Sequence, residues 1–234
     1  MAFVGIRHLV VAKIKNENPG SAIEYEAGLV MGEPIRANVT ISRGTNPLYA
    51  GDREVENENG ITGISTEVEA EDLTDQVRVY ALGDKALTGN DEGTYRQTDA
   101  AAPYVGYGFV RVRKRRGKRY FQSVWNHKAQ FGENSESTTT KNENVEWQTP
   151  TVVARGQGVN LDDSGELAWR DRHTFNNLAD AQEWLDDKAN LPDAYDPTKT
   201  YAVGDTVTYQ EAVWKCKTAI TTAEDWTAAH WELV

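Results

Sequence analysis

The chain has 234 residues, a formal net charge of −11 at neutral pH and hydrophobic residues at 39% of its positions. This length allows one or two domains with a substantial core, and the acidic balance disfavours a dedicated nucleic-acid-binding protein. The single cysteine, Cys216, excludes an intramolecular disulfide and a cysteine-based metal cluster. We expect neither a signal peptide nor a membrane anchor. Arg7 and His8 interrupt the apolar N-terminal residues, and no run approaches the ~18 apolar residues of a spanning helix.

Residues 1–190 predict a mainly β domain. Short runs that are rich in β-branched residues and alternate in polarity predict strands, and turn-forming residues such as Asn59-Gly60 separate them. The predicted strands are residues 6–14, 35–41, 104–112, 120–131 and 145–154. Residues 73–82 suit either a strand or a short helix capped by Asp72, and the four-residue spacing of Leu73, Val77 and Ala81 favours the helix.

Residues 177–189 predict an amphipathic helix. Asn176 or Asn177 can cap its start, and Asn190-Leu191-Pro192 can end it. An apolar stripe must be buried against another element, so we expect this helix to cover a sheet. The stripe consists of Leu178, Ala181, Trp184, Leu185 and the aliphatic part of Lys188.

Two predicted connections, residues 43–63 and 83–103, are long for a compact domain. Loops beyond about 12–15 residues are usually functional or disordered, and in an assembly they often become ordered against a neighbour. In the first connection Asp52, Glu54, Glu56 and Glu58 alternate. A calcium loop would need a glycine where Asn57 stands, so charged residues on one face of a solvated strand are the favoured interpretation.

Residues 111–119 are all Lys or Arg except Val112 and Gly117. This pattern fits a phosphate-binding ribbon or a β-hairpin with Gly117 at its tip that meets an acidic partner. The rest of the chain is acidic, especially residues 52–75, so we favour contact between identical subunits and expect Arg113, Arg115 and Arg116 to make it.

No motif predicts catalytic, cofactor-binding or metal-binding residues, so we expect no enzymatic activity. The four histidines are scattered, and the sequence lacks a phosphate-binding glycine loop and a nucleophile elbow. The pairs Gly106-Tyr107-Gly108 and Gly156-Gln157-Gly158 have no third glycine and fit bulges or close strand approaches.

Residues 191–234 predict a small all-β module that follows a linker at Leu191-Pro192-Asp193. Three of the chain's seven tryptophans, Trp214, Trp226 and Trp231, lie in this part. One interpretation is structural: Tyr201, Trp214 and Trp231 form a small packed core. The other is functional: some of the rings form a surface that stacks on sugar rings. Trp226 and Tyr195 are the better candidates for that surface, and Trp231 is a third.

Residues 1–190 resemble the major tail proteins of long-tailed bacteriophages, the tail-tube proteins. The residues that carry the resemblance are 5–14, 37–44, 46–50, 55–57, 60–63, 103–109, 124–128 and 146–150. The resemblance implies a β-sandwich with a flanking helix, six copies of which close a β-barrel ring. Stacked rings form the tube through which double-stranded DNA passes without specific binding.

The same resemblance implies partners and a location. Asn46, Pro47 and Tyr49 would lie in an arm, residues 43–63, that bridges subunits and rings. Tape-measure and tail-terminator proteins would be further partners. The protein would be made in the host bacterial cytoplasm and end in the virion.

Residues 195–234 resemble a small chitin-binding-type carbohydrate module. Tyr201, Gly204-Asp205, Val207, Tyr209, Trp214 and Trp231 carry this second resemblance, and Ala219-Ile220 stands where many members have adjacent tryptophans. It implies that a host cell-wall glycan is a partner. Two hypotheses remain open: a tube subunit with an external binding module, or a stand-alone carbohydrate-binding or carbohydrate-processing protein.

Overall fold

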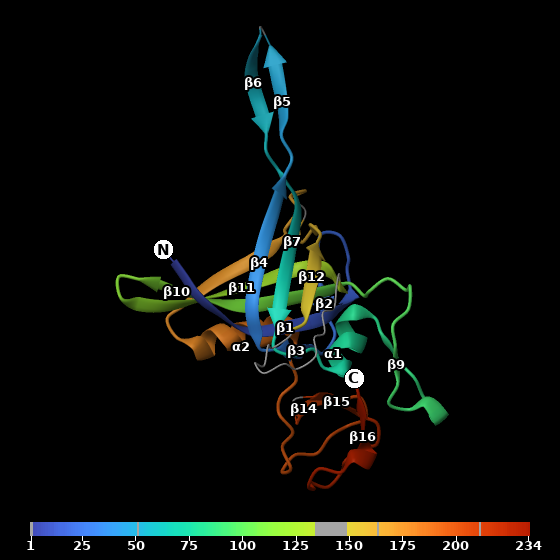
Figure 1. Ribbon diagram of the computed structural model, residues 1–234. Helices are drawn as coiled ribbons and strands as arrows, with labels where there is room; N and C mark the ends of the chain where they lie inside the picture. Colours follow the sequence, from blue (N-terminus) through green and yellow to red (C-terminus); the bar gives the residue numbers. More distant parts are fainter. Residues whose placement is uncertain (1, 51, 134–148, 163, 211) are drawn as a thin grey trace, which may run out of the picture.

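A curved nine-stranded antiparallel sheet forms most of the computed structural model, which describes residues 2–50, 52–133, 149–162, 164–210 and 212–234 (Figure 1). The main strand order is β2-β1-β10-β11-β12-β7-β4, with β3 paired to β1 and β13 paired to β11. Their bounds are β1 Ala2–Asn16, β2 Glu24–Tyr25, β3 Leu29–Gly32, β4 Pro34–Arg43, β7 Ile61–Ala70, β10 Val105–Arg115, β11 Lys118–Glu133, β12 Thr151–Gly156 and β13 Arg170–Phe175.

The predicted strands at 6–14, 35–41, 104–112 and 120–131 are confirmed as parts of β1, β4, β10 and β11. The fifth, 145–154, overlaps β12 only at its end, and residues 145–148 lie outside the described residues. Strands β7 and β13 were missed. In β7 the buried Ile64, Thr66, Val68 and Ala70 alternate with polar residues, so the two-residue signal was present and was overlooked. Strand β13 begins Arg-Asp-Arg-His and shows no such alternation.

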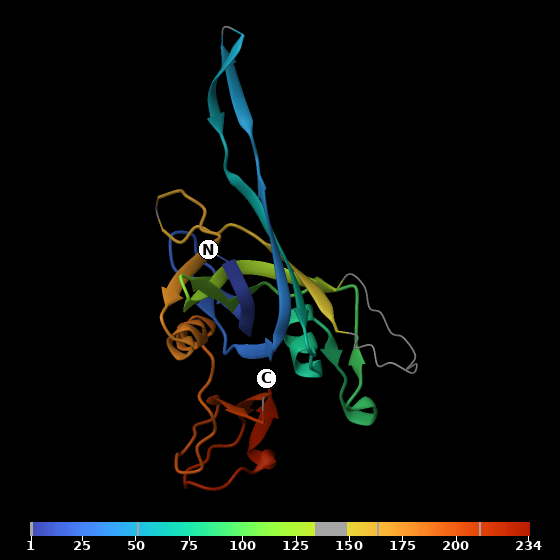
Figure 2. The ribbon, with the colours of Figure 1, turned by 60° about the vertical axis from the view of Figure 1, so that its left-hand side comes forward.

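Most of the first long connection is β-structure, so treating it as a long loop was wrong, whereas the second remains largely irregular around one short strand pair. Residues 43–63 continue β4 and β7 into a second ribbon, β5 Asn46–Ala50 and β6 Arg53–Glu58. This hairpin projects away from the body (Figures 1 and 2). The alternating acidic residues therefore lie in or next to a strand, as favoured over the calcium loop. Residues 83–103 hold the short pair β8 Lys85–Ala86 and β9 Tyr95–Arg96 and the 3-10 turn η2 Gly89–Asp91.

The main core lies inside the curve of the sheet. Its largest fully buried side chains include Leu9, Met31, Tyr80, Tyr107 and Phe109. The Tyr107 hydroxyl donates to Thr66 Oγ1 at 2.7 Å. Both side chains are fully buried, so this hydrogen bond gives each hydroxyl group a partner in the core.

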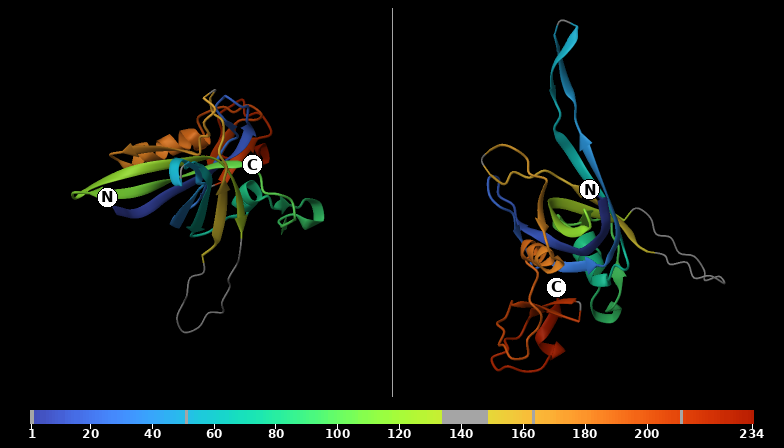
Figure 3. Two further views of the ribbon diagram at one scale, coloured as in Figure 1. Left: turned by 90° about the horizontal axis from the view of Figure 1, so that it is seen from above. Right: turned by 90° about the vertical axis from the view of Figure 1, so that its left-hand side faces the viewer.

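Helix α2, Leu178–Ala189, covers the outer face of β1, β10 and β11, as predicted (Figure 3). Its cap is Asn177, whose side chain accepts from the Asp180 N–H at 2.8 Å, and it ends at Asn190 in the left-handed conformation. Trp125 and Leu185 pack between helix and sheet. Gly108 makes this approach possible, because a Cβ there would stand 2.6 Å from Leu185 Cδ2. A Cβ at Gly108 would also stand 2.8 Å from the Val124 carbonyl oxygen of β11, so the predicted close strand approach is confirmed for this glycine.

Asp171 on β13 holds helix and sheet together. Its carboxylate contacts His127 Nε2 at 3.2 Å and accepts from Lys188 Nζ at 3.1 Å. The hydrogen bond with His127 is the main cause that lowers the pKa of Asp171 to about 2, and Lys188 adds to it.

Of the ambiguous residues 73–82, residues 75–82 are helical, as favoured over the strand. They form α1 Asp75–Val77 and the π-helical turn η1 Arg78–Leu82, which ends at Gly83 with φ +86°. The cap is Thr74 rather than the predicted Asp72, whose carboxylate instead accepts from the Leu73 N–H at 2.8 Å. Among the described residues, no helix has the length and apolar character that a membrane crossing requires.

Candidate glycan-binding site

The C-terminal module is a three-stranded antiparallel sheet with an aromatic cluster. Its elements are β14 Thr206–Tyr209, β15 Ala212–Cys216, the 3-10 turn η3 Ala228–His230 and β16 Trp231–Leu233. The turn before β14 uses Gly204 at φ +99°, and Asp205 Oδ2 accepts from the Ala202 N–H at 2.7 Å. The predicted mainly β fold with a flanking helix and a small all-β C-terminal part is confirmed.

Trp231 is the centre of the module's core. It is 2% exposed, and with Val207, Cys216 and Ile220 it forms the buried cluster of this part of the chain. Its ring has no solvent-facing side, so the prediction of Trp231 as a glycan-stacking residue was wrong. The packed-core interpretation of Trp231 is the one that the burial supports.

Trp226 is more enclosed than its polar neighbours Asp225 and Thr227 predict. Its ring stacks on Tyr209 with centroids 3.9 Å apart and planes at 14°, and on Trp231 at 5.1 Å and 13°. The edge of Tyr195 meets it at 5.1 Å. Trp226 and Tyr195 are both half-buried rather than fully exposed. Flat protein rings therefore occupy much of the surface that a sugar would use on Trp226.

Tyr209 and Trp214 complete the half-buried part of the aromatic cluster. The Trp214 Nε1–H donates to the Tyr209 carbonyl at 3.1 Å, and Trp214 meets Trp226 edge-on at 5.5 Å. Trp214 packs against the buried cluster of the module, as the packed-core interpretation predicted, and Tyr209 was given no stacking role. Along β15, Trp214 shares a face with the buried Cys216, whereas Val213 points to the other face, against the large domain.

Three half-buried rings, Tyr209, Trp214 and Trp226, thus form one aromatic cluster, which Tyr195 borders. Aromatic rings offer apolar area at low conformational cost, with indole and hydroxyl groups as polar partners. Because Tyr209 and Trp231 stack on Trp226, a pyranose ring could stack only on the parts of this cluster that these contacts leave free. Tyr195 is fixed by its hydroxyl, which donates to the Glu224 carbonyl at 2.8 Å.

The module is docked on the large domain through Gln76. This side chain is 9% exposed; its Nε2 donates to the Val213 carbonyl at 2.9 Å, and its Oε1 accepts from the Val213 N–H at 3.4 Å. The Val213 side chain joins the core of the large domain. The Gln76 Nε2 also donates to the Val234 carbonyl at 3.3 Å, just beyond the end of β16. The side-chain amide of Gln76 thus extends the hydrogen bonding of the small sheet past its last strand.

The predicted linker is likewise ordered. The Leu191 N–H donates to the Asp186 carbonyl at 2.9 Å at the end of α2. Two residues further on, the Asp193 carbonyl accepts from the Thr208 N–H at 2.8 Å in β14. One end of this connection is therefore hydrogen-bonded to the large domain, and the other end is hydrogen-bonded to the module.

The predicted inter-subunit residues lie in two separate places. Arg113 and Arg115 are on β10 and Arg116 is in the turn to β11, where Arg116 and Gly117 have φ of +47° and +81° as in a two-residue hairpin turn. The predicted hairpin with Gly117 at its tip is confirmed. Asn46, Pro47 and Tyr49 are on β5, in the projecting hairpin.

A cleft of about 660 Å³ lies between the module and the large domain. Its lining combines the apolar Val30, Met31 and Val213 with the carboxylates Glu33, Glu71 and Asp72. None of the described residues that line it is aromatic. Among the described residues, no group of three or more His, Cys, Asp or Glu side chains could hold a metal ion.

Comparison with known proteins identifies the small module. Residues 194–231 match the model of carbohydrate-binding module family 5/12. The match spans the aromatic cluster from Tyr195 to Trp231, so the chain carries a carbohydrate-binding-type module at its C-terminal end. No curated protein sequence matches the chain.

Proposed function

We propose that the chain is a structural subunit of a bacteriophage tail tube that carries an external carbohydrate-binding module. The resemblance of residues 1–190 to tail-tube proteins motivates the proposal. The observation that supports it best is the projecting β5–β6 hairpin together with the exposed apolar face of β4, where Ile35 is 51% and Ile41 is 38% exposed. A long strand with an uncovered apolar face needs a partner.

In this proposal six subunits form a ring and rings stack into the tube. Double-stranded DNA passes through the lumen without specific binding, and the net charge of −11 limits its adhesion. Tape-measure and tail-terminator proteins are the other partners. The protein is made in the host bacterial cytoplasm, becomes part of the virion and catalyses no reaction.

The module lies at the end of the molecule opposite the β5–β6 hairpin (Figure 1). Docking through Gln76 and Val213 gives it a fixed orientation, so many copies would face the host surface in one array. Weak binding of a cell-wall glycan at each module would then be amplified by multivalency.

Purified full-length protein is expected to sediment as rings or longer particles as its concentration rises, and negative-stain images are expected to show rings or tubes. The exposed β4 face is the reason, because its burial favours association. A protein that stays monomeric across the whole concentration range would contradict the tube proposal.

Replacing Tyr209 with alanine is expected to weaken retention of the protein on chitin or on insoluble host cell wall by roughly 2–10-fold per site, the size of one aromatic contact. The physical reason is loss of one ring of the aromatic cluster. The matched control is Tyr95→Ala, which removes a 36% exposed tyrosine outside the module. If the wild type binds neither material while the module is folded, the glycan part of the proposal fails.

A second candidate is a stand-alone carbohydrate-binding or carbohydrate-processing protein. The family 5/12 match and the carboxylates Glu33, Glu71 and Asp72 in the cleft favour it. Within the described part of the chain no aromatic ring lines the cleft for a sugar to stack on, and for this reason we favour the tube subunit. A monomer that binds or hydrolyses a glycan would reverse the ranking.

A further inference from the structure

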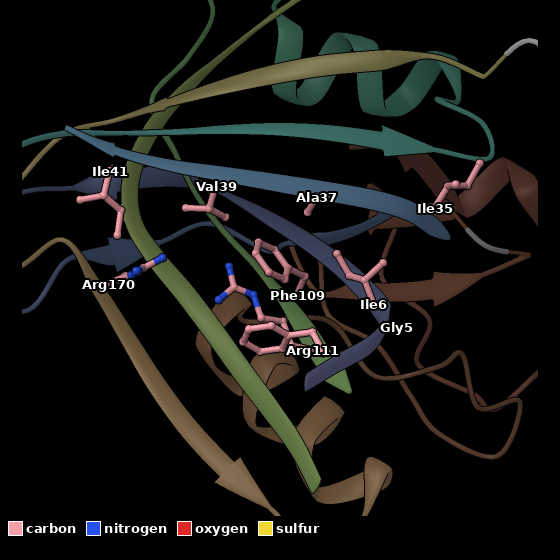
Figure 4. Close-up of a pocket in the computed structure, with 10 residues that line it drawn as sticks. Gly5, Ile6, Ile35, Ala37, Val39, Ile41, Phe109, Arg111 and Arg170 are labelled. Carbon is pink, nitrogen blue, oxygen red and sulfur yellow. The ribbon is translucent and has the colours of Figure 1, made fainter. Parts of the chain in front are cut away.

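A groove with a mostly apolar lining separates β4 from β1 and β10. It has a volume of about 460 Å³, which lies in the size range of small-molecule sites (Figure 4). Ile35, Ala37, Val39 and Ile41 of β4 form one wall, and Ile6 and Phe109 lie across from them. Ile35 and Ile41 are exposed, so part of this apolar lining meets water in the single chain. Covering it with an apolar ligand is favourable.

The groove also holds two positive charges without a counter-charge. Arg111 of β10 and Arg170 of β13 line it, and their guanidinium groups point into the space beneath β4 (Figure 4). Both side chains are half-buried. Among the described residues, no carboxylate forms an ion pair with either of them. A half-buried charge without a partner is costly, so an anion that enters the groove is stabilised there.

The electrostatic environment of the two arginines points to the same kind of ligand. Burial, and then the charges of Arg170 and Arg172, lower the pKa of Arg111. Burial, and then the charge of Arg172, lower the pKa of Arg170. Desolvation and like charges therefore both disfavour the protonated guanidinium groups, and a bound anion offsets both effects.

Charged and apolar side chains lie toward different ends of the groove. Figure 4 shows both guanidinium groups near the end where Ile41 lies, whereas Ile6 and Ile35 lie toward the other end. The extended strand from Ile35 to Ile41 covers about 20 Å, at roughly 3.3 Å per residue. A long ligand with its charge at one end fits this arrangement better than a compact anion does.

We infer that the groove between β4, β1 and β10 binds a single-chain amphiphile with a carboxylate head group. The alkyl chain covers Ile6, Ile35 and Val39, and the carboxylate accepts hydrogen bonds from Arg111 and Arg170, whose planar guanidinium groups match its two oxygens. This inference goes beyond the proposed function. It concerns the free subunit, because the β4 face meets a neighbour in the proposed tube.

The first test compares ligands that share one alkyl chain and differ in the charge of the head group. Dodecanoate, dodecanol and dodecyltrimethylammonium are titrated into the full-length protein by calorimetry, below micelle-forming concentrations and where the protein sediments as a monomer. Dodecanoate is expected to saturate a single site and to bind at least about 10-fold more tightly than dodecanol, because only its head group pairs with the arginines. Dodecyltrimethylammonium should bind more weakly than dodecanol, and acetate should show no binding at the same concentrations.

The second test changes the two parts of the groove separately. Arg111→Gln with Arg170→Gln is expected to weaken dodecanoate binding by about 10-fold or more and to leave dodecanol binding unchanged, a split that misfolding would not produce. Ile35→Ser should weaken both ligands by roughly 2–10-fold, because it removes apolar contact area. The matched control is Lys85→Gln with Arg96→Gln, the same charge change on the exposed β8–β9 pair, which should bind like the wild type.

Three results would overturn the inference. The first is the absence of saturable dodecanoate binding to the wild type. The second is equal affinity for dodecanoate and dodecanol, since the arginines would then hold no head group. The third is dodecanoate binding that neither groove variant changes, because the ligand would then lie elsewhere, for example on the aromatic cluster of the module. The tube proposal stands or falls separately, on whether the wild type assembles.

Discussion

Replacement of Trp231 by alanine is expected to unfold residues 191–234 and to leave the large domain folded. Trp231 is 2% exposed and packs against Tyr195, Tyr201 and Trp226. Truncating a buried tryptophan costs about 3–5 kcal/mol, and a unit of this size has little stability to lose. Limited proteolysis read by mass spectrometry should show cleavage confined to residues 191–234, together with loss of retention on chitin or cell wall.

The control for this substitution lies two residues further along the same strand. Leu233 is 46% exposed, so Leu233→Ala should change the free energy of unfolding by no more than about 0.5 kcal/mol. Wild-type protease resistance of the Trp231→Ala protein would show that Trp231 does not hold the module together.

Gln76→Ala is expected to release the module from the large domain without unfolding either part. The substitution leaves the buried N–H of Val213 without its acceptor and removes one of the two donors to the Val213 carbonyl, the other being the Val234 N–H, at a cost of about 1–3 kcal/mol. Hydrogen exchange at the Val213 amide should speed up by roughly 5- to 150-fold, which is the same free energy expressed as a rate ratio. Solution scattering should report a larger maximum dimension.

Gln157→Ala is the matched control, because the Gln157 side chain also donates a hydrogen bond, to Tyr104 Oη at 3.3 Å, but on an exposed surface of the large domain. It should leave exchange at Val213 unchanged. If Gln76→Ala gave the same exchange and dimensions as the wild type, the contact of the Val213 side chain with the core would be sufficient for docking.

These two substitutions separate two roles of one module. The Trp231 change removes the fold of the aromatic cluster, whereas the Gln76 change removes only its fixed orientation. If binding by an array depends on orientation, Gln76→Ala should reduce retention of assembled particles more than retention of single chains.

Local features were predictable from the sequence because their causes are local. Alternating apolar residues predicted strands such as β10 and β11. A two-residue hairpin turn needs positive φ, which glycine adopts easily, and this requirement predicted Gly117 at the tip between the two strands. Asn177 capped α2 through its own side chain. The turn residues and aromatic pattern of the C-terminal module predicted a small β-unit of the carbohydrate-binding type, in agreement with the family match.

Only the tertiary structure decided which of those surfaces are covered. Gln76 and Val213 lie 137 positions apart, and no periodicity links them, so their pairing and the docked module could not be predicted. Trp226 stands in a polar stretch, yet Tyr209 and Trp231 pack on its ring. The alternation of β4 predicted an apolar face but not its exposure, since burial depends on whether a strand distant in sequence closes over it.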